Sequence, residues 1–274
     1  MSYKVLVLDI DGTVTNSNKK VTPKTKEAIM KLQEDGIIVV VASGRPTYGV
    51  LPLAKELRLD EYGGYILSFN GGKIINCTTK EVVFEKILPE NYLGKLADLA
   101  KENDCEMMSY DGNCVITTNP IDPFIEIEAK INKLPIKNIA SFHKYDKIPV
   151  NKCIVTAEDE HLAEVEKLFV KEFGQELSIF RSEPFFLEIM PKDIDKAFSL
   201  EKLLEYLNYK KEEMVACGDG FNDLSMIKFA GMGVAMENAQ QVVKDAADFI
   251  TKSNDEDGVA FAIEQLFQSK NYKI

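Results

Sequence analysis

The sequence is poor in the side chains that most often bind zinc or act as general bases. It has two histidines, His143 and His161, and their separation does not match a metal-binding motif. It has no tryptophan, and its five cysteines contain no Cys-x-x-Cys pair. An odd number of unpaired cysteines suits free thiols in a reducing compartment better than a disulfide scaffold or a zinc site. We therefore expect any chemistry to use carboxylates and lysines.

Long apolar runs are also missing. The longest, residues 37–42, is far too short for a transmembrane helix, and the apolar run 5–8 is stopped at Asp9, unlike a signal peptide. These features predict a cytoplasmic globular protein. The 274 residues include 33 basic and 44 acidic side chains, a net charge of -11. Such a surface repels nucleic acid and anionic membranes, but a local cation or metal would still allow a small phosphorylated ligand to bind.

The first third of the chain alternates between strand and helix patterns. Residues 4–10, 37–42 and 65–69 each contain an apolar run typical of a strand covered on both faces. Between the first two runs, Thr22 and Pro23 form an N-cap and first helical position, and Gly36 ends the helix. This order predicts an α/β fold with a Rossmann-like, doubly wound parallel sheet.

The middle of the chain has a different pattern. Residues 82–188 contain strand and helix signals in an order typical of an α+β domain, and the first pattern resumes after Pro191. We therefore predict a core formed by residues 1–81 and 189–274, with an inserted α+β cap domain at 82–188.

An acidic motif follows the first predicted strand. Asp9 and Asp11 are alternate residues of an extended segment, so their side chains can face one substrate. Gly12 allows a sharp turn, and Thr13 adds a hydroxyl. Ligands of open parallel sheets bind beyond the carboxyl ends of the strands, which makes these residues candidates for a catalytic site.

This motif resembles Asp-x-Asp-x-Thr, the first motif of phosphatases of the haloacid dehalogenase superfamily. Residues 43–46, Ser-Gly-Arg-Pro, resemble its second motif, and Lys196 resembles the third. Lys196 is followed by alanine, whereas many members have glycine there, and Lys192 competes for the same role. Residues 218–223 resemble the acidic fourth motif. The turn 70–72, followed by an insert, is similar to the Cof-type subgroup, type IIB, which has a large α+β cap.

The resemblance implies a mechanism. Asp9 would attack the phosphorus of a phosphomonoester and form an aspartyl-phosphate, while Asp11 would protonate the leaving alcohol and then accept a proton from water. A dianionic phosphate among several carboxylates needs a cation, and Mg²⁺ fits because it prefers oxygen ligands. The implied ligands are the Asp9 and Asp219 carboxylates and the Asp11 backbone carbonyl. Asp223 would either support this metal or be a charge at a helix N-terminus.

The remaining implied site residues contact phosphate or the rest of the substrate. The phosphate would be held by Ile10, Thr13, Ser43, Gly44, Lys196 and Asn222. Four residues are candidate contacts for the rest of the substrate: Arg45, Asn70, Arg181 and Glu188. Each of them is equally explained as a surface or hinge residue.

These residues predict a phosphoric monoester hydrolase acting on a small metabolite such as a sugar phosphate, a nucleotide or a phosphorylated cofactor. Two alternatives remain open: a phosphomutase of the phosphomannomutase type, which shares Asp-x-Asp-Gly-Thr, and a non-catalytic module that binds magnesium and phosphate. The oligomeric state is not indicated by the sequence.

Overall fold

The computed structural model describes residues 3–267 and divides the chain into two compact units. The first consists of Met1–Phe84 and Asp195–Ile274, and the second, Glu85–Ile194, is inserted between them in sequence. No helix among the described residues combines the length and apolar character needed to cross a membrane.

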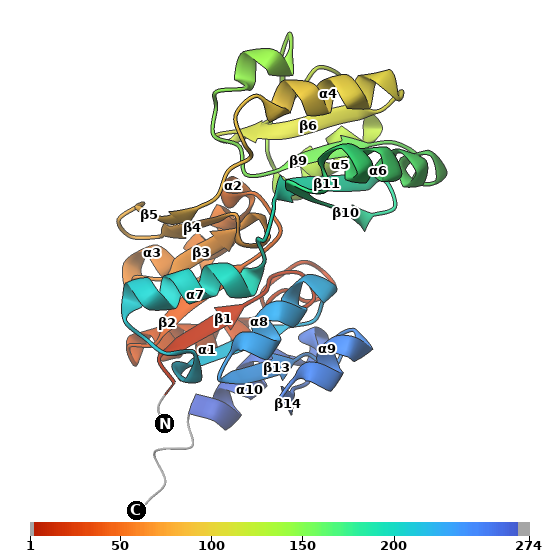
Figure 1. Ribbon diagram of the computed structural model, residues 1–274. Coiled ribbons are helices and arrows are strands. Elements are labelled where there is room, and N and C mark those ends of the chain that lie inside the picture. Colours follow the sequence, from red (N-terminus) through yellow and green to blue (C-terminus); the bar gives the residue numbers. More distant parts are fainter. Residues whose placement is uncertain (1–2, 268–274) are drawn as a thin grey trace, which may run out of the picture. The chain divides into compact units, whose positions relative to one another are not determined.

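The first unit is built on an eight-stranded sheet with the order β14-β13-β12-β1-β2-β3-β4-β5 (Figure 1). The strands from β14 to β3 pair in parallel, and β4 is antiparallel to β3. This arrangement confirms the predicted α/β class with a mainly parallel core sheet. The strands are β1 (Val5–Leu8), β2 (Ile38–Ala42), β3 (Tyr65–Ser68), β4 (Lys73–Asn76), β5 (Val82–Glu85), β12 (Met214–Gly218), β13 (Met232–Ala235) and β14 (Phe249–Ile250).

Helix α1 of this unit begins and ends where the sequence signals place it. The Thr22 hydroxyl caps α1 by accepting a hydrogen bond from the Thr25 amide, and Gly36, with φ +83°, lies just beyond its end. The helices are α1 (Pro23–Glu34), α2 (Thr47–Glu56), α3 (Leu59–Tyr62), α7 (Lys196–Leu207), α8 (Leu224–Phe229), α9 (Gln241–Ala246) and α10 (Gly258–Phe267), with short 3-10 turns η1 (Phe69–Gly71), η3 (Lys211–Glu213), η4 (Phe221–Asp223) and η5 (Asn254–Glu256).

The central strands carry the core and align the site. Every residue of β1 and β12 is buried, as expected for strands covered on both faces. In the parallel register Leu8 lies opposite Cys217 on β12 and Val41 on β2. The loops that follow these three strands therefore emerge side by side at one edge of the sheet.

The second unit is a six-stranded sheet with the order β10-β11-β9-β6-β7-β8, antiparallel except where β8 pairs in parallel with β7. A hydrophobic cluster that includes Leu96, Val155 and Phe169 joins this sheet to α4 and α6. The strands are β6 (Glu106–Asp111), β7 (Cys114–Thr117), β8 (Ile136–Asn138), β9 (Cys153–Thr156), β10 (Leu177–Glu183) and β11 (Phe186–Pro191); the helices are α4 (Tyr92–Glu102), α5 (Pro123–Asn132) and α6 (Asp159–Phe173), with a 3-10 turn η2 (Phe142–Tyr145).

The limits of the insert differ from the predicted 82 and 188. Residues 82–85 form strand β5 (Val82–Glu85), as the sequence predicted. The strand belongs to the edge of the first unit's sheet, however, and not to the inserted unit to which the prediction assigned it. Strand β11 (Phe186–Pro191) continues past residue 188, and the division falls at Ile194. A short apolar run predicts a strand without showing which sheet it joins.

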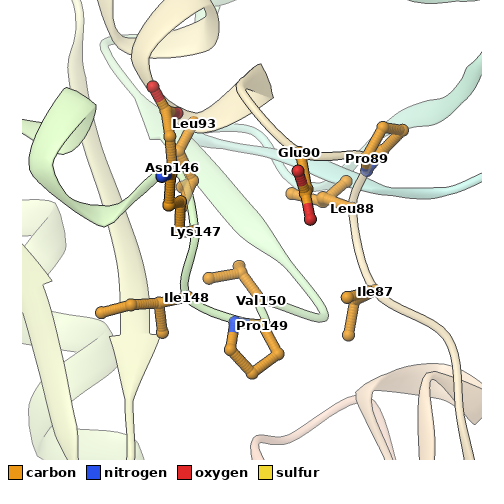
Figure 2. Close-up of a pocket in the computed structure, with 10 residues that line it drawn as sticks. All are labelled: Ile87, Leu88, Pro89, Glu90, Leu93, Asp146, Lys147, Ile148, Pro149 and Val150. Carbon is orange, nitrogen blue, oxygen red and sulfur yellow. The ribbon is translucent and has the colours of Figure 1, made fainter.

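The second unit also has a small, partly open pocket (Figure 2). Two segments of the unit, 87–90 and 146–150, line it together with Leu93, and the Leu88 amide donates to the Val150 carbonyl between them. None of the candidate site residues lines this pocket.

Candidate active site

Three carboxylates meet at the edge of the parallel sheet. Asp9 follows β1, Asp219 follows β12, and Asp223 ends the turn η4. One carboxylate oxygen from each lies within 4.8 Å of the others. Asp9 and Asp223 are buried, and Asp219 is partly exposed. The adjacency of β1 and β12 thus brings together carboxylates that are more than two hundred residues apart in the sequence.

A buried ammonium lies against this group. Lys196, the first residue of α7, has no exposed surface. Its Nζ donates to Asp9 Oδ1 at 2.7 Å, to Asp223 Oδ1 at 2.6 Å and to the Ala42 carbonyl at 2.9 Å. These contacts use all three of its donors. The lysine that resembled the third motif is therefore fixed between two of the acidic residues.

One ammonium does not balance three carboxylates. Burial and the nearby Asp223 raise the pKa of Asp9 to about 8. Burial likewise raises the pKa of Asp219 to about 6, although the Thr13 hydroxyl opposes this change. Burial alone would lower the pKa of Lys196, but Asp223 and Asp9 outweigh it and raise the pKa above its ordinary value. The site therefore has an excess of negative charge that a cation would relieve.

The turn after Asp9 is shaped to fit Asp219. Gly12 has φ +83°, and a Cβ at this position would lie 2.3 Å from Asp219 Oδ2, so only glycine fits. The Thr13 hydroxyl donates to Asp219 Oδ1 at 2.7 Å. In this structure Thr13, a candidate phosphate contact, orients the Asp219 carboxylate.

The fourth-motif loop is held by Asp223. Its Oδ2 accepts hydrogen bonds from the Asp219 and Gly220 amides, both at 2.9 Å, while its Oδ1 accepts from Lys196. Asn222 donates to the Asn70 side chain at 3.0 Å. Asp223 thus orders the loop that presents Asp219, and Asn222 and Asn70 lie together.

Asp11 has a different environment from Asp9. Arg45 donates from Nε to Asp11 Oδ2 and from its terminal nitrogen to Oδ1, both at 2.8 Å, and Lys19 Nζ donates to Oδ1 at 3.0 Å. Burial would raise the pKa of Asp11, but the hydrogen bonds and charges of Arg45 and Lys19 outweigh it and lower the pKa. Lys19 was not predicted, because nothing in the sequence distinguishes it from the other lysines near the site.

The second-motif residues follow β2, which lies beside β1. Ser43 is buried, and its hydroxyl accepts a hydrogen bond from the Arg45 amide at 3.2 Å. A Cβ on Gly44 would lie 3.1 Å from the Asn70 side chain, so Gly44 and Asn70 are close neighbours. Ile10 is buried directly after Asp9. The first-unit candidates therefore gather at one sheet edge.

Two candidate substrate contacts belong to the second unit. Arg181 contacts the Asp159 and Glu166 carboxylates. Glu188 is buried and pairs with Lys152 at 3.2 Å, leaving Glu188 Oε2 buried without a hydrogen-bond partner. Lys152 was not anticipated from the sequence.

The family model for haloacid dehalogenase-like hydrolases matches residues 6–263. The chain belongs to this family. It is 35% identical to the provisionally named phosphatase YxeH of Bacillus subtilis, over 98% of this chain and all of YxeH. It is 31% identical to the B. subtilis 5-amino-6-(5-phospho-D-ribitylamino)uracil phosphatase YcsE, over 96% of this chain and 95% of YcsE. These relatives confirm the predicted enzyme class, a phosphatase.

Solved structures agree with the family assignment. A haloacid dehalogenase-like hydrolase from Bacteroides thetaiotaomicron has a TM-score of 0.94 and 50% identity, covering 97% of this chain and all of that chain. A haloacid dehalogenase subclass IIB sugar phosphatase has a TM-score of 0.80 and 24% identity, covering 96% of this chain and 98% of that chain. The second similarity concerns the fold alone.

Proposed function

We propose that this phosphatase is Mg²⁺-dependent and hydrolyses a small phosphorylated metabolite through an aspartyl-phosphate on Asp9. The observation that carries the proposal is the group formed by Asp9, Asp219 and Asp223 around Lys196 at the carboxyl edge of the sheet. A nucleophile, a charge partner and oxygen ligands lie together where open α/β sheets bind their ligands.

The donor set fits a hard divalent cation. Mg²⁺ holds oxygens at about 2.1 Å, so its ligand oxygens lie within about 4.2 Å of one another. The three carboxylate oxygens lie within 4.8 Å, and their excess negative charge is not neutralised by Lys196 alone. The Asp9 and Asp219 carboxylates and the Asp11 carbonyl would hold the ion, with Asp223 supporting the loop. When bound, Mg²⁺ supplies charge neutralisation for the phosphoryl oxygens.

The side chains divide the two chemical steps between them. In the first, an Asp9 oxygen bonds to phosphorus, the bond from phosphorus to the leaving oxygen breaks, and Asp11 gives that oxygen a proton. In the second, the oxygen of water bonds to phosphorus, Asp11 takes a proton from it, and the bond to Asp9 breaks. Inorganic phosphate and the original carboxylate result.

Other first-unit residues would hold the phosphate. Lys196 Nζ, already 2.7 Å from Asp9 Oδ1, is close enough to the nucleophile to offset charge on the transferring group. The Ser43 hydroxyl, the Gly44 and Ile10 amides and the Asn222 side chain lie on loops at the same edge, and Thr13 acts through Asp219.

The substrate class follows from size and charge. The net charge of -11 disfavours nucleic acid and anionic membranes, whereas a sugar phosphate, a nucleotide or a phosphorylated cofactor needs only the local cations. The relative YcsE is named for a small phosphorylated substrate of this kind. We also propose a cytoplasmic location, which suits the five free cysteines.

The test is a phosphate-release assay on a panel of phosphorylated metabolites and p-nitrophenyl phosphate, with Mg²⁺ or with EDTA. We expect release only with Mg²⁺, background release by Asp9→Asn, and wild-type release by Asp35→Asn, which changes an exposed aspartate of the same unit. Magnesium-dependent release by Asp9→Asn would contradict the mechanism. Transfer of phosphate within a sugar without release would favour the phosphomutase alternative, and no turnover would favour the binding module.

A further inference from the structure

Asp11 is held by a two-pronged contact from Arg45. The guanidinium donates from Nε to one carboxylate oxygen and from its terminal nitrogen to the other, both at 2.8 Å. A planar guanidinium in this bidentate geometry fixes both the position and the plane of a carboxylate, which a single ammonium does not. The second cation, Lys19, contacts one oxygen and is 67% exposed, whereas the Arg45 side chain is 23% exposed.

Arg45 is itself fixed by its surroundings. Its amide donates to the Ser43 hydroxyl at 3.2 Å, and its carbonyl accepts from the Phe69 amide at 3.0 Å. Pro46 follows it directly and precedes the first turn of α2. Both backbone polar groups of Arg45 are therefore anchored, so its guanidinium projects toward Asp11 from a rigid base.

We propose that Arg45 is a positioning residue that orients Asp11 for proton transfer, and not a contact to the substrate. The inference rests on the proposed function, in which Asp11 exchanges protons with the leaving oxygen and with water. Both bidentate donors of Arg45 are directed at Asp11, and correct placement of a reacting group can be worth roughly 10²-fold in rate.

The two chemical steps distinguish a residue that positions Asp11 from a residue that contacts the substrate. p-Nitrophenolate leaves as an anion, so bond formation to Asp9 and departure of this leaving group need no proton from Asp11. In the second step, the oxygen of water bonds to phosphorus, the bond to Asp9 breaks, and a proton of that water passes to Asp11. A misplaced Asp11 therefore slows the second step and spares the first.

The experiment is stopped-flow release of p-nitrophenolate by Arg45→Met with Mg²⁺. We expect the first equivalent per active site to appear at the wild-type rate, the steady phase to slow roughly 10²-fold, and KM not to increase. Arg45→Lys keeps the charge but loses the two-pronged contact, and should fall between Arg45→Met and wild type. Lys19→Met should slow the steady phase less than Arg45→Met.

Arg58→Met is the matched control, because Arg58 forms an exposed pair with Glu61 in the same unit. It should show wild-type kinetics. A higher KM with unchanged kcat in Arg45→Met would make Arg45 a substrate contact and overturn the proposal. Equal slowing of both phases, or slowing that follows a loss of thermal stability, would also overturn it. If the wild type releases no phosphate from any phosphomonoester, the proposed function itself fails, which is a distinct result.

Discussion

Lys196→Met is the substitution for which the structure gives the most direct energetic prediction. The side chain is fully buried, and its ammonium contacts Asp9, Asp223 and the Ala42 carbonyl at 2.6 to 2.9 Å. Methionine preserves most of the aliphatic stem, so the substitution removes the charge and three hydrogen bonds while leaving little empty space.

The expected cost follows from the charges left behind. Removing one partner of a buried ion pair costs about 3–5 kcal/mol, because the remaining charge is buried without compensation. Here two carboxylates lose their partner, which favours the upper end of this range. Two effects limit the loss of folding free energy: Asp223 still accepts hydrogen bonds from two backbone amides, and Asp9 can take up a proton. The cost should therefore be smaller at about pH 5 than at about pH 8.

The measurement is urea unfolding followed by circular dichroism, with EDTA present. Lys202→Met is the control on the same helix, because Lys202 forms an exposed pair with Glu205 at 3.0 Å. That pair should contribute no more than about 0.5 kcal/mol. Asp223→Asn in the Lys196→Met background should recover part of the loss, as expected for residues in contact. A cost below about 1 kcal/mol for Lys196→Met, with no coupling to Asp223, would refute the reasoning.

The remaining predictions concern charge, backbone and capping. Folding raises the pKa of Asp9 from 3.8 to about 8, so Asp9 binds its proton more tightly in the folded protein. The metal-free protein should therefore lose stability as pH rises through this range. In thermal melts, the melting temperature should depend less on pH for Asp9→Asn, and for the wild type with Mg²⁺. Gly12→Ala and Gly36→Ala both place alanine at φ +83°, but only the alanine at position 12 would collide with Asp219. In chemical denaturation, Gly36→Ala should lower the free energy of unfolding by about 1–2 kcal/mol, and Gly12→Ala should lower it by more. Equal losses would contradict the proposed fit between Gly12 and Asp219. Thr22→Ala should cost about 1 kcal/mol by removing the cap of α1, and an unchanged denaturation midpoint would exclude that role.

The parts of the site that could be predicted are those attached to buried parallel strands. A continuous apolar run marks such a strand, and its carboxyl end marks where a ligand binds, so the positions after β1, β2 and β12 follow from sequence. Asp9 was predicted in this way, and Ser43 and Asp219 were identified through the resemblance to family motifs that follow such strands. Lys196 was identified through the resemblance to the family motif, since its helix alone gives no reason for burial.

Other features depend on contacts that no local pattern encodes. The pairing of Lys19 with Asp11, and of Lys152 with Glu188, joins lysines that resemble ordinary surface lysines in sequence. The sheet to which β5 belongs is set by tertiary pairing. Helix α5 is different, because Asp122 followed by Pro123 repeats the cap signal of α1, and the Asp122 side chain does accept hydrogen bonds from the first-turn amides. That helix could have been predicted.

The two aspartates of the first motif lie in opposite electrostatic environments. Asp9 is buried beside Asp223, and its pKa is raised, whereas Asp11 is held by Arg45 and Lys19, and its pKa is lowered. In the proposed mechanism Asp9 is the nucleophile and Asp11 carries the proton, so without a metal both pKa shifts run opposite to what these roles require. A nucleophile must be ionised, so the Asp9 environment is unfavourable for catalysis until a further positive charge is present. Two of the carboxylates that create this deficit, Asp9 and Asp219, are those that we propose bind the divalent cation, so cation binding would also favour the ionised form of Asp9.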